Sequence, residues 1–418
     1  MKRVVVTGIG IIAPLGIGKD LYWEKVKKSA SGLSAVKEFD PFNFRSKSFG
    51  VVKDFDPAVL GLSLSEARRM DRITQMGVIC TAEAIKDAHL DWEKTDRDRV
   101  GVSIGNAISG TKFMDEEFVV LTHRAETEVL PEDVSPYAYA KSMPNTTCNE
   151  VAYKYGLTGI CCTMATGCTA GIDSVGFAYD LIRSGDKDIV IAGSAETPVT
   201  PITIAAFEAI RTLSTNNDPP EMASRPFDNT RNGFVLGEGA GIVILEELQH
   251  AKKRGAYIYG EITGFSSVNN ATHMTALPSD GGGVTRSIEL AMKEAKIAKE
   301  EIDYISAHGS GTRQNDTCET GAYKKTFGDY AYHIPISSTK SMVGHALGAA
   351  TAIELVTCFL ALRDNFIPPT INYSEKDETC DLDYVPNEGR EKEINLILKD
   401  ASGFAGIHTA IVLKKFSK

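Results

Sequence analysis

Ala165-Thr166-Gly167-Cys168-Thr169-Ala170-Gly171 lies between a predicted strand at 159–164 and a predicted helix at 172–184. The helix is indicated by apolar residues that line one face, and Gly185 marks its end. Those apolar residues are Ile172, Val175, Tyr179 and Ile182. A strand that runs through a turn of small residues into a helix is typical of layered α/β proteins, so this stretch predicts that fold class.

The same order of elements occurs twice along the chain. An apolar helix, a charged segment and a strand follow one another at 82–105 and again at 288–309. Each half then has a strand that leads into a helix, before Cys168 in the first and before His345 in the second. Duplicated α/β halves bring equivalent strand ends to one crevice, so we expect these two residues to face each other. The alternative is a chance likeness between α/β segments.

Strand-like and helix-like segments alternate along the rest of the chain, without a low-complexity linker. The predicted strands include 3–7, 100–104, 189–192, 241–245, 302–306 and 394–398. The predicted helices include 65–89, 172–184, 284–296 and 346–363. This alternation favours a single layered unit over separate all-α and all-β domains.

Composition and charge exclude several classes of protein. The 418 residues carry a formal net charge of -10, so no overall field favours nucleic acid or an anionic membrane surface. No stretch approaches the roughly 20 apolar residues of a membrane helix. The sequence begins Met-Lys-Arg and passes directly into apolar Val4-Val5-Val6, unlike a signal peptide. We therefore expect a cytoplasmic protein.

The eight cysteines form no C-x-x-C pair, which is unlike a disulfide scaffold or a zinc site. No other spacing of cysteine and histidine matches a zinc pattern, so no metal site is expected. Cys161, Cys162 and Cys358 are predicted to be buried small hydrophobic residues.

Cys168 has a different setting, between a strand and a helix start. The free N–H groups of a helix start lower the pKa of a nearby thiol, which predicts an activated nucleophile. Gly167 and Gly171 are interpreted as serving no core and as leaving room for substrate. The layout resembles the nucleophile elbow of hydrolases, although the G-x-S-x-G pattern is absent.

Two histidines have comparable settings. His308 lies where a strand meets a loop rich in Gly and hydroxyl residues, and His345 follows Gly344 at the start of an apolar helix. Together they indicate donors for negative charge that develops during acyl chemistry. By contrast, Gly8-Ile9-Gly10-Ile11-Ile12-Ala13 matches part of a dinucleotide fingerprint, but Pro14 follows at once. A pyrophosphate-binding helix is not expected there.

In these settings Cys168, His308, Lys340 and His345 resemble the Cys-His-His set of the beta-ketoacyl-acyl carrier protein synthases. The resemblance runs nearly end to end, through Val4–Gly10, Ala223–Asp228, Gly233–Gly239 and Ser402–Gly406. Three stretches, 166–176, 196–201 and 308–316, are most similar to the ketosynthase alpha subunit of type II aromatic polyketide synthases. The loop Gly403-Phe404-Ala405-Gly406-Ile407-His408 departs from the family pattern at Ala405 and Ile407-His408. We therefore expect the gating of the acyl pocket to differ from that of the family.

The resemblance implies a thiolase-like fold of two related halves, 1–250 and 251–418, in a five-layered α/β/α/β/α arrangement. It implies that an acyl group moves from the phosphopantetheine arm of a carrier protein to Cys168, and that His308 and His345 promote decarboxylation of a malonyl thioester. It also implies further roles for five residues. Lys340 and Glu319 would orient the network, Phe404 would join Cys168 in an oxyanion hole, and Thr312, His273 and Phe404 would line the substrate pocket.

The resemblance also implies protein partners, while no cofactor is expected on this chain. Carrier proteins are acidic, so Arg68, Arg69 and Arg72 on one predicted helix are candidates for docking, with a solvated helix face as the alternative. The leading expectation is an alpha subunit paired with a homologous chain-length factor. The alternatives are a homodimeric fatty-acid synthase of the same family, a non-catalytic chain-length factor and a Cys-His hydrolase.

Overall fold

The computed structural model describes residues 1–37, 39–41, 43–123, 126–278 and 280–417. In these ranges most strands belong to one long mixed sheet that two five-stranded halves build together. The halves meet where Val4–Val6 pairs antiparallel with Gly260–Ile262.

The first half-sheet has the order β6-β5-β7-β8-β1. β5 runs parallel to β6 and β7, whereas β8 runs antiparallel to β7 and β1. The strands are β1 (Val4–Ala13), β5 (Val100–Gly105), β6 (Cys161–Cys162), β7 (Ile189–Glu196) and β8 (Gly239–Glu247). All but β6 are buried along their length.

The second half-sheet repeats this topology strand for strand, in the order β11-β10-β14-β15-β9. β10 runs parallel to β11 and β14, and β15 runs antiparallel to β14 and β9. The strands are β9 (Gly260–Asn269), β10 (Tyr304–Ser306), β11 (Ile336–Ser337), β14 (Leu396–Gly403) and β15 (Ile407–Lys414). The same order and directions in both halves confirm the predicted duplication.

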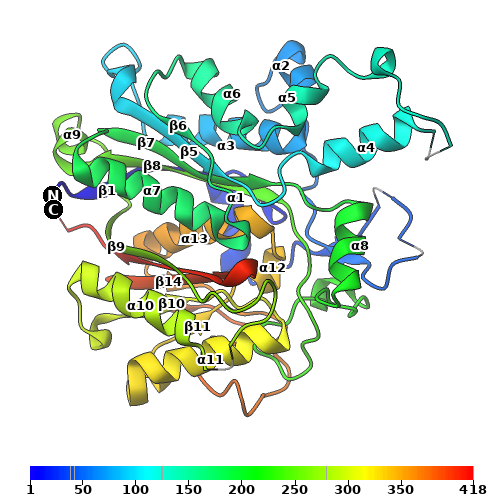
Figure 1. Ribbon diagram of the computed structural model, residues 1–418. Coiled ribbons are helices and arrows are strands. Elements are labelled where there is room, and N and C mark those ends of the chain that lie inside the picture. The colour runs from blue at the N-terminus through cyan, green and yellow to red at the C-terminus, as the bar shows by residue number, and fades with distance from the viewer. Residues whose placement is uncertain (38, 42, 124–125, 279, 418) are drawn as a thin grey trace.

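Helices complete five layers, which Figure 1 shows from top to bottom. α3 (Arg72–Asp87) and α6 (Thr146–Tyr155) cover the outer face of the first half-sheet, and α10 (Gly282–Ala295) and α11 (Arg313–Phe327) cover that of the second. α7 (Ala170–Ser184) and α13 (Ala350–Asp364) lie between the two half-sheets. α13 is buried from Ala350 to Leu362, as a central layer requires. The five-layered fold is thus confirmed.

Several glycines are required by close packing of helices on strands and on each other. A Cβ at Gly10 would lie 2.2 Å from the Cys80 carbonyl oxygen of α3. The segment Gly8–Ala13, which matches part of a dinucleotide fingerprint, is part of β1 and begins no helix. A Cβ at Gly171 would lie 2.7 Å from the backbone nitrogen of Ala352. The expectation that Gly171 serves no core was therefore wrong, because this glycine lets α7 and α13 approach each other.

The predicted helix at 65–89 is two helices, α2 (Leu64–Arg69) and α3. The break has a local cause, because Met70 and Asp71 are extended and the Asp71 side chain accepts a hydrogen bond from Thr74 N as the N-cap of α3. Arg68 and Arg69 therefore end one helix and Arg72 begins the next, which corrects the expectation of a single basic helix.

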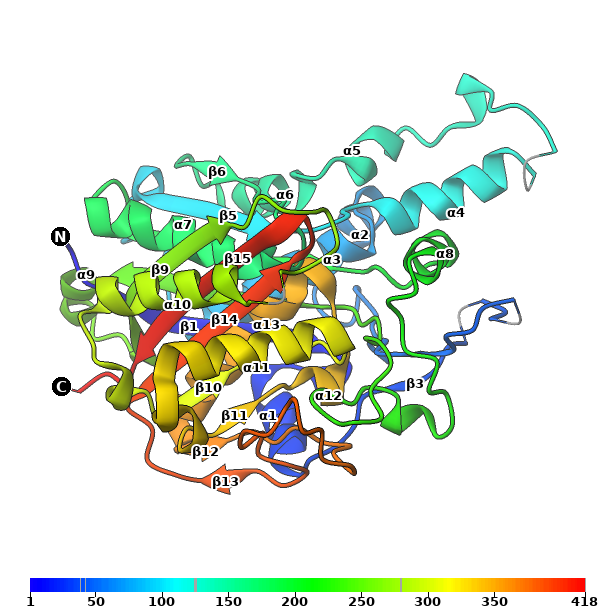
Figure 2. The same ribbon diagram turned by 60° about the horizontal axis from the view of Figure 1, so that its bottom comes forward.

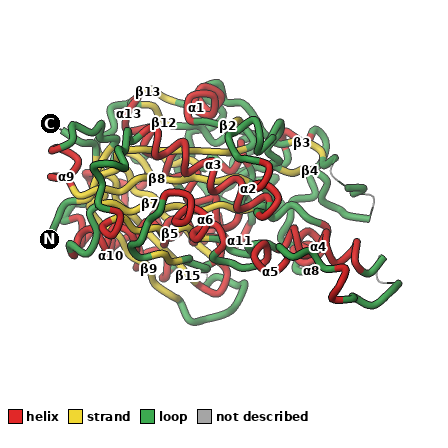
Figure 3. The backbone as a smooth tube through the Cα atoms, turned by 90° about the horizontal axis from the view of Figure 1, so that it is seen from above, coloured by secondary structure: helices red, strands yellow, loops and turns green. Residues whose placement is uncertain are grey.

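An arm extends from the layered body at the end opposite the two termini (Figures 2 and 3). It contains α4 (Thr111–Leu121) and α5 (Ala138–Ser142), and α8 (Pro201–Ala209) lies near its base. Among the described residues, no helix has both the length and the apolar character needed to cross a bilayer.

Candidate active site

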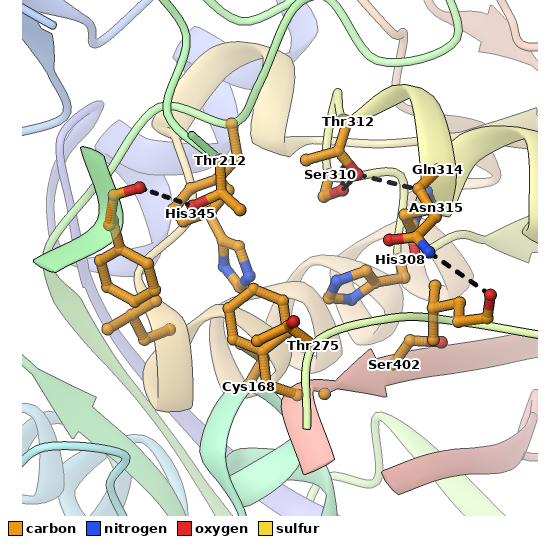
Figure 4. Close-up of a pocket in the computed structure, with 16 residues that line it drawn as sticks. Cys168, Thr212, Thr275, His308, Ser310, Thr312, Gln314, Asn315, His345 and Ser402 are labelled. Atoms are coloured by element: carbon orange, nitrogen blue, oxygen red, sulfur yellow. Dashed lines mark hydrogen bonds between the residues drawn. The ribbon is translucent and has the colours of Figure 1, made fainter. Parts of the chain in front are cut away.

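Cys168, His308 and His345 line one cavity, here called the Cys168 cavity. Figure 4 shows both imidazole rings directed into this space, with Cys168 beside them. One wall is mostly polar, with Ser310, Thr312, Gln314 and Asn315, and another is apolar, with Phe207, Phe234 and Leu347. The shared crevice that the duplicated halves predict is thus present.

A tight turn and a buried carboxylate position Cys168. It lies in a 3-10 turn at Gly167–Thr169, directly before α7, and Gly167 has a left-handed φ of 65°. Asp173 of α7 accepts hydrogen bonds from Thr166 Oγ1 at 2.6 Å, Thr169 Oγ1 at 2.7 Å and Thr409 Oγ1 at 2.9 Å. Sequence reasoning missed Asp173, which ties both sides of the nucleophile turn to β15.

The thiol of Cys168 is not acidic in the free protein. Burial raises its pKa to about 11, although the charge of Lys340 and the backbone N–H groups of Phe404 and Cys168 act to lower it. The helix-start amides thus act in the predicted direction, but burial outweighs them. The expectation of a low thiol pKa was therefore wrong, because burial has a larger effect on the pKa than the amides of the turn.

The two histidines come from the second half of the chain. His308 follows β10, and His345 follows Gly344, whose left-handed φ of 74° turns the chain toward the 3-10 turn at Leu347–Ala349 and then α13. Their ring centroids are 5.3 Å apart with planes at 81°. Burial and the charge of Lys340 hold both pKa values well below their usual range. Both rings are therefore neutral at physiological pH and can each donate one N–H hydrogen bond.

Lys340 and Glu319 hold the backbone of His308 from opposite sides. Lys340 Nζ, in α12 (Lys340–Val343), donates to the His308 carbonyl oxygen at 2.6 Å. Glu319 of α11 accepts the N–H groups of His308 at 2.6 Å and Gly309 at 2.8 Å. The two residues therefore contact the histidine backbone in the way that an orienting role requires.

Sequence reasoning missed two charged residues behind the histidines. Glu354 of α13 pairs with Lys340 through one carboxylate oxygen, and its other oxygen lies 2.8 Å from Lys399 Nζ. All three side chains are buried. Glu354 and Lys399 stand in apolar stretches of α13 and β14, so no local pattern marks them.

The remaining candidate pocket residues differ in position. Phe404 and Thr312 line the Cys168 cavity, and Phe404 is 37% exposed. His273 does not line the cavity. Its Nδ1 accepts the backbone N–H groups of Thr275 and Ala276, each at 3.1 Å, on an exposed loop. Thr275 contributes to the cavity wall from that loop.

The three candidate docking arginines are also placed differently from one another. Arg69 forms a bidentate pair with Glu150, and Arg72 pairs with Glu238 at 2.6 Å and lies over the Phe55 ring. Arg68 is exposed. Two of the three charges are thus already neutralised within the chain.

The three cysteines that were predicted to be buried differ in their exposure. Cys358 is buried in α13, as expected. Cys161 is exposed and Cys162 is half-buried. Those two predictions were wrong, because β6 is a two-residue strand at the end of the long sheet and has a neighbour, β5, on one side only.

A duplicated five-layered fold with a cysteine and two neutral imidazoles in one cavity defines a thiolase-fold acyl-transferring enzyme. Residues 1–251 match the N-terminal domain of the beta-ketoacyl synthases, and residues 259–374 match their C-terminal domain. The chain therefore belongs to the beta-ketoacyl synthase family and is an acyltransferase.

Two relatives align with nearly the full length of the chain. It is 44% identical to the tetracenomycin polyketide synthase ketoacyl synthase alpha subunit of Streptomyces glaucescens, over 99% of this chain and 97% of that one. It is 42% identical to a 3-oxoacyl-[acyl-carrier-protein] synthase 2 of Coxiella burnetii, over 99% of both chains.

A solved structure extends this likeness to three dimensions. It is a type II polyketide synthase acyl carrier protein in complex with its ketosynthase bound to the hexaketide. The matched chain has 40% sequence identity and a TM-score of 0.93, with both chains covered completely.

Proposed function

We propose that this chain is the catalytic alpha subunit of a type II polyketide ketosynthase, which extends an acyl chain held on Cys168 by decarboxylative condensation with malonyl-carrier protein. The observation that carries the proposal is the Cys168 cavity itself. It brings the thiol, backbone amides that contact its sulfur and two neutral imidazoles together. The named polyketide relative and the carrier-bound ketosynthase support the polyketide assignment.

In the first step the Cys168 sulfur attacks the thioester carbonyl of an acyl-carrier protein. The thiol proton passes to a neutral imidazole as the carbon–sulfur bond forms, and the departing phosphopantetheine thiolate takes up a proton. The amides of Cys168 and Phe404 are suited to hold the oxyanion, because their N–H groups already contact the sulfur. The products are acyl-Cys168 and free carrier thiol.

In the second step a malonyl thioester takes the place of the first carrier. The malonyl carboxylate leaves as CO₂, and its electron pair forms an enolate whose oxygen accepts hydrogen bonds from His308 and His345. The enolate carbon attacks the acyl carbonyl, and the Cys168 thiolate leaves and regains a proton. Neutral imidazoles suit this role because each donates an N–H without a competing charge on the ring. No bound cofactor enters this scheme, since the acyl groups arrive on the phosphopantetheine arm.

We propose that the chain works in the cytoplasm with protein partners. The arm exposes large apolar side chains, which are typical of a subunit interface: Met114, Phe118, Val119, Val120, Val129, Leu130, Tyr137 and Tyr139. We assign this surface to a homologous chain-length factor. Arg68, together with Arg69 and Arg72 if their internal pairs open, is proposed to dock the acidic carrier protein.

Mass spectrometry of the intact protein after incubation with acyl-loaded carrier protein tests the proposal. We expect the mass of one acyl group on the wild-type chain and no adduct on Cys168→Ala. An adduct that persists in Cys168→Ala would refute the nucleophile assignment. Acyl transfer without release of CO₂ from malonyl-carrier protein would refute the condensation step.

A homodimeric fatty-acid synthase is the second candidate, because the fatty-acid relative is nearly as similar in sequence. Purification of the chain alone and together with its genomic neighbour separates the two functions. Condensation by the isolated chain with saturated acyl carriers would favour the fatty-acid enzyme. A non-catalytic chain-length factor is disfavoured by the thiol in the cavity. A hydrolase would release free acid without condensation.

A further inference from the structure

Behind the two imidazoles lies a buried cluster of two ammonium groups that share one carboxylate. Lys340 and Lys399 each pair with a different oxygen of Glu354, and none of the three side chains is more than 2% exposed. Lys399 comes from β14 and also donates to the Ala307 carbonyl oxygen at 3.3 Å and to its neighbouring Asp400 carbonyl oxygen at 2.5 Å. Two lysines from different elements thus contact the consecutive carbonyls of Ala307 and His308.

The burial of two ammonium groups destabilises the fold unless other groups compensate their charges. Burial of an ammonium group costs several kcal/mol unless a charge and hydrogen bonds compensate it. One carboxylate would neutralise Lys340 alone, whereas here it is divided between two cations. Asp400 also acts on Lys399, and Glu319 acts on Lys340. Two ammonium groups therefore lie among several acidic side chains, close to the groups on which the enolate forms.

We propose that Lys399 is a positioning residue of the condensation site, which holds the Ala307–His308 backbone from β14 and places a second ammonium group, beside that of Lys340, behind His308 and His345. The effect of Lys399 on condensation rests on the proposed function, whereas its effect on the pKa values of the two histidines does not. Lys399 thus has a role that Lys340 alone does not fill. Substitution of Lys399 by a neutral residue removes one of the two cations behind the rings and its hydrogen bond to the Ala307 carbonyl oxygen.

The charged and titratable groups around the two rings come from every element packed against them. They are Cys168 before α7, Glu319 of α11, Lys340 of α12, Glu354 of α13, Lys399 and Asp400 of β14, and His408 of β15. Lys399 lowers the pKa of both His308 and His345. Removal of this cation must therefore raise both pKa values.

Lys399→Met and Arg254→Met in the full chain, in complex with its partner subunit, test this role. Arg254 is the matched control, because it pairs at 2.6 Å with the buried carboxylate of Glu246, which lies toward the opposite end of β8 from the His345 segment. The pKa values of the two rings are measured by NMR of ¹³C-labelled histidine, with assignments from His308→Gln and His345→Gln. In Lys399→Met we expect both values to rise by about one unit, whereas Arg254→Met leaves them unchanged.

The pH dependence of CO₂ release from malonyl-carrier protein is the second readout. Its acid limb is expected at higher pH in Lys399→Met and at the wild-type position in Lys399→Arg, which keeps the charge. Should Lys399→Met fail to fold, Lys399→Gln serves in both measurements. Unchanged histidine pKa values in a folded neutral variant overturn the inference. If the wild-type protein releases no CO₂ but the histidine pKa values still rise in Lys399→Met, the proposed function is wrong, and the electrostatic role of Lys399 toward the two rings stands.

Discussion

Thr166 and Thr409 donate to opposite oxygens of the same carboxylate, and replacing each by valine separates positioning of the nucleophile from general stability. Thr166 Oγ1 bonds Asp173 Oδ2 at 2.6 Å from the nucleophile turn, whereas Thr409 Oγ1 bonds Oδ1 at 2.9 Å from β15. A hydrogen bond to a charged group contributes about 1.5–3 kcal/mol. For a chain of 418 residues that loss lowers Tm by roughly 2–3 °C.

We expect both variants to lose a similar amount of Tm but to differ in chemistry. In Thr166→Val the turn that carries Cys168 loses the bond to Asp173 on its N-terminal side and keeps only that of Thr169, so the rate of acylation by acyl-carrier protein falls on the order of tenfold. In Thr409→Val the turn keeps its bonds and the acylation rate stays within about twofold. Quenched-flow mass spectrometry measures the rate, and differential scanning calorimetry measures Tm. Equal acylation rates in the two variants would refute a positioning role for Asp173.

Three further predictions concern packing, protonation and backbone strain. Gly171→Ala forces a methyl group against Ala352 and should lower the free energy of unfolding by about 1–3 kcal/mol. Gly321→Ala lies in the open interior of α11 and should raise it by about 0.5–1 kcal/mol. Calorimetry compares the two variants. The thiol of Cys168 is neutral below its pKa of about 11. Its alkylation by iodoacetamide should therefore accelerate about tenfold per pH unit from pH 7 to 10. A plateau of the alkylation rate near pH 8 would contradict the raised pKa. Ala405 has a left-handed φ of 63°, so Ala405→Gly should raise Tm slightly, and a clear fall in Tm would show that the loop carries no strain.

Three residues of the Cys168 cavity could be predicted from the sequence because each interrupts a regular pattern. Cys168 and His308 follow strands and His345 follows α12, each beside a glycine at a junction between elements, where side chains of a layered α/β protein reach the surface of a cleft. Glu354 and Lys399 could not be found in this way. They lie within a helix and a strand that are otherwise apolar, and the partners that satisfy their charges come from other elements.

The thiol pKa escaped prediction for a related reason. The amides that lower it belong to the local turn around Cys168, which the sequence pattern indicates, and to Phe404, which the family resemblance implies. Burial depends on how both halves close over the sulfur, and this contribution is the larger. A local motif therefore places a cysteine in a cavity more reliably than it predicts the protonation state of its thiol.

The duplication explains why Cys168 and His345 meet. Each follows a glycine with a left-handed φ and precedes a central helix, and α7 and α13 contact each other where Gly171 faces Ala352. The separation of nucleophile and imidazole is thus set by helix packing in the central layer, whereas His308 is held at the end of β10 by charged side chains. Changes in the central layer should therefore disturb acyl transfer and condensation together. Changes in the charged cluster should act on both steps through protonation, because the cluster lowers the pKa of both imidazoles and Lys340 also lowers that of the thiol.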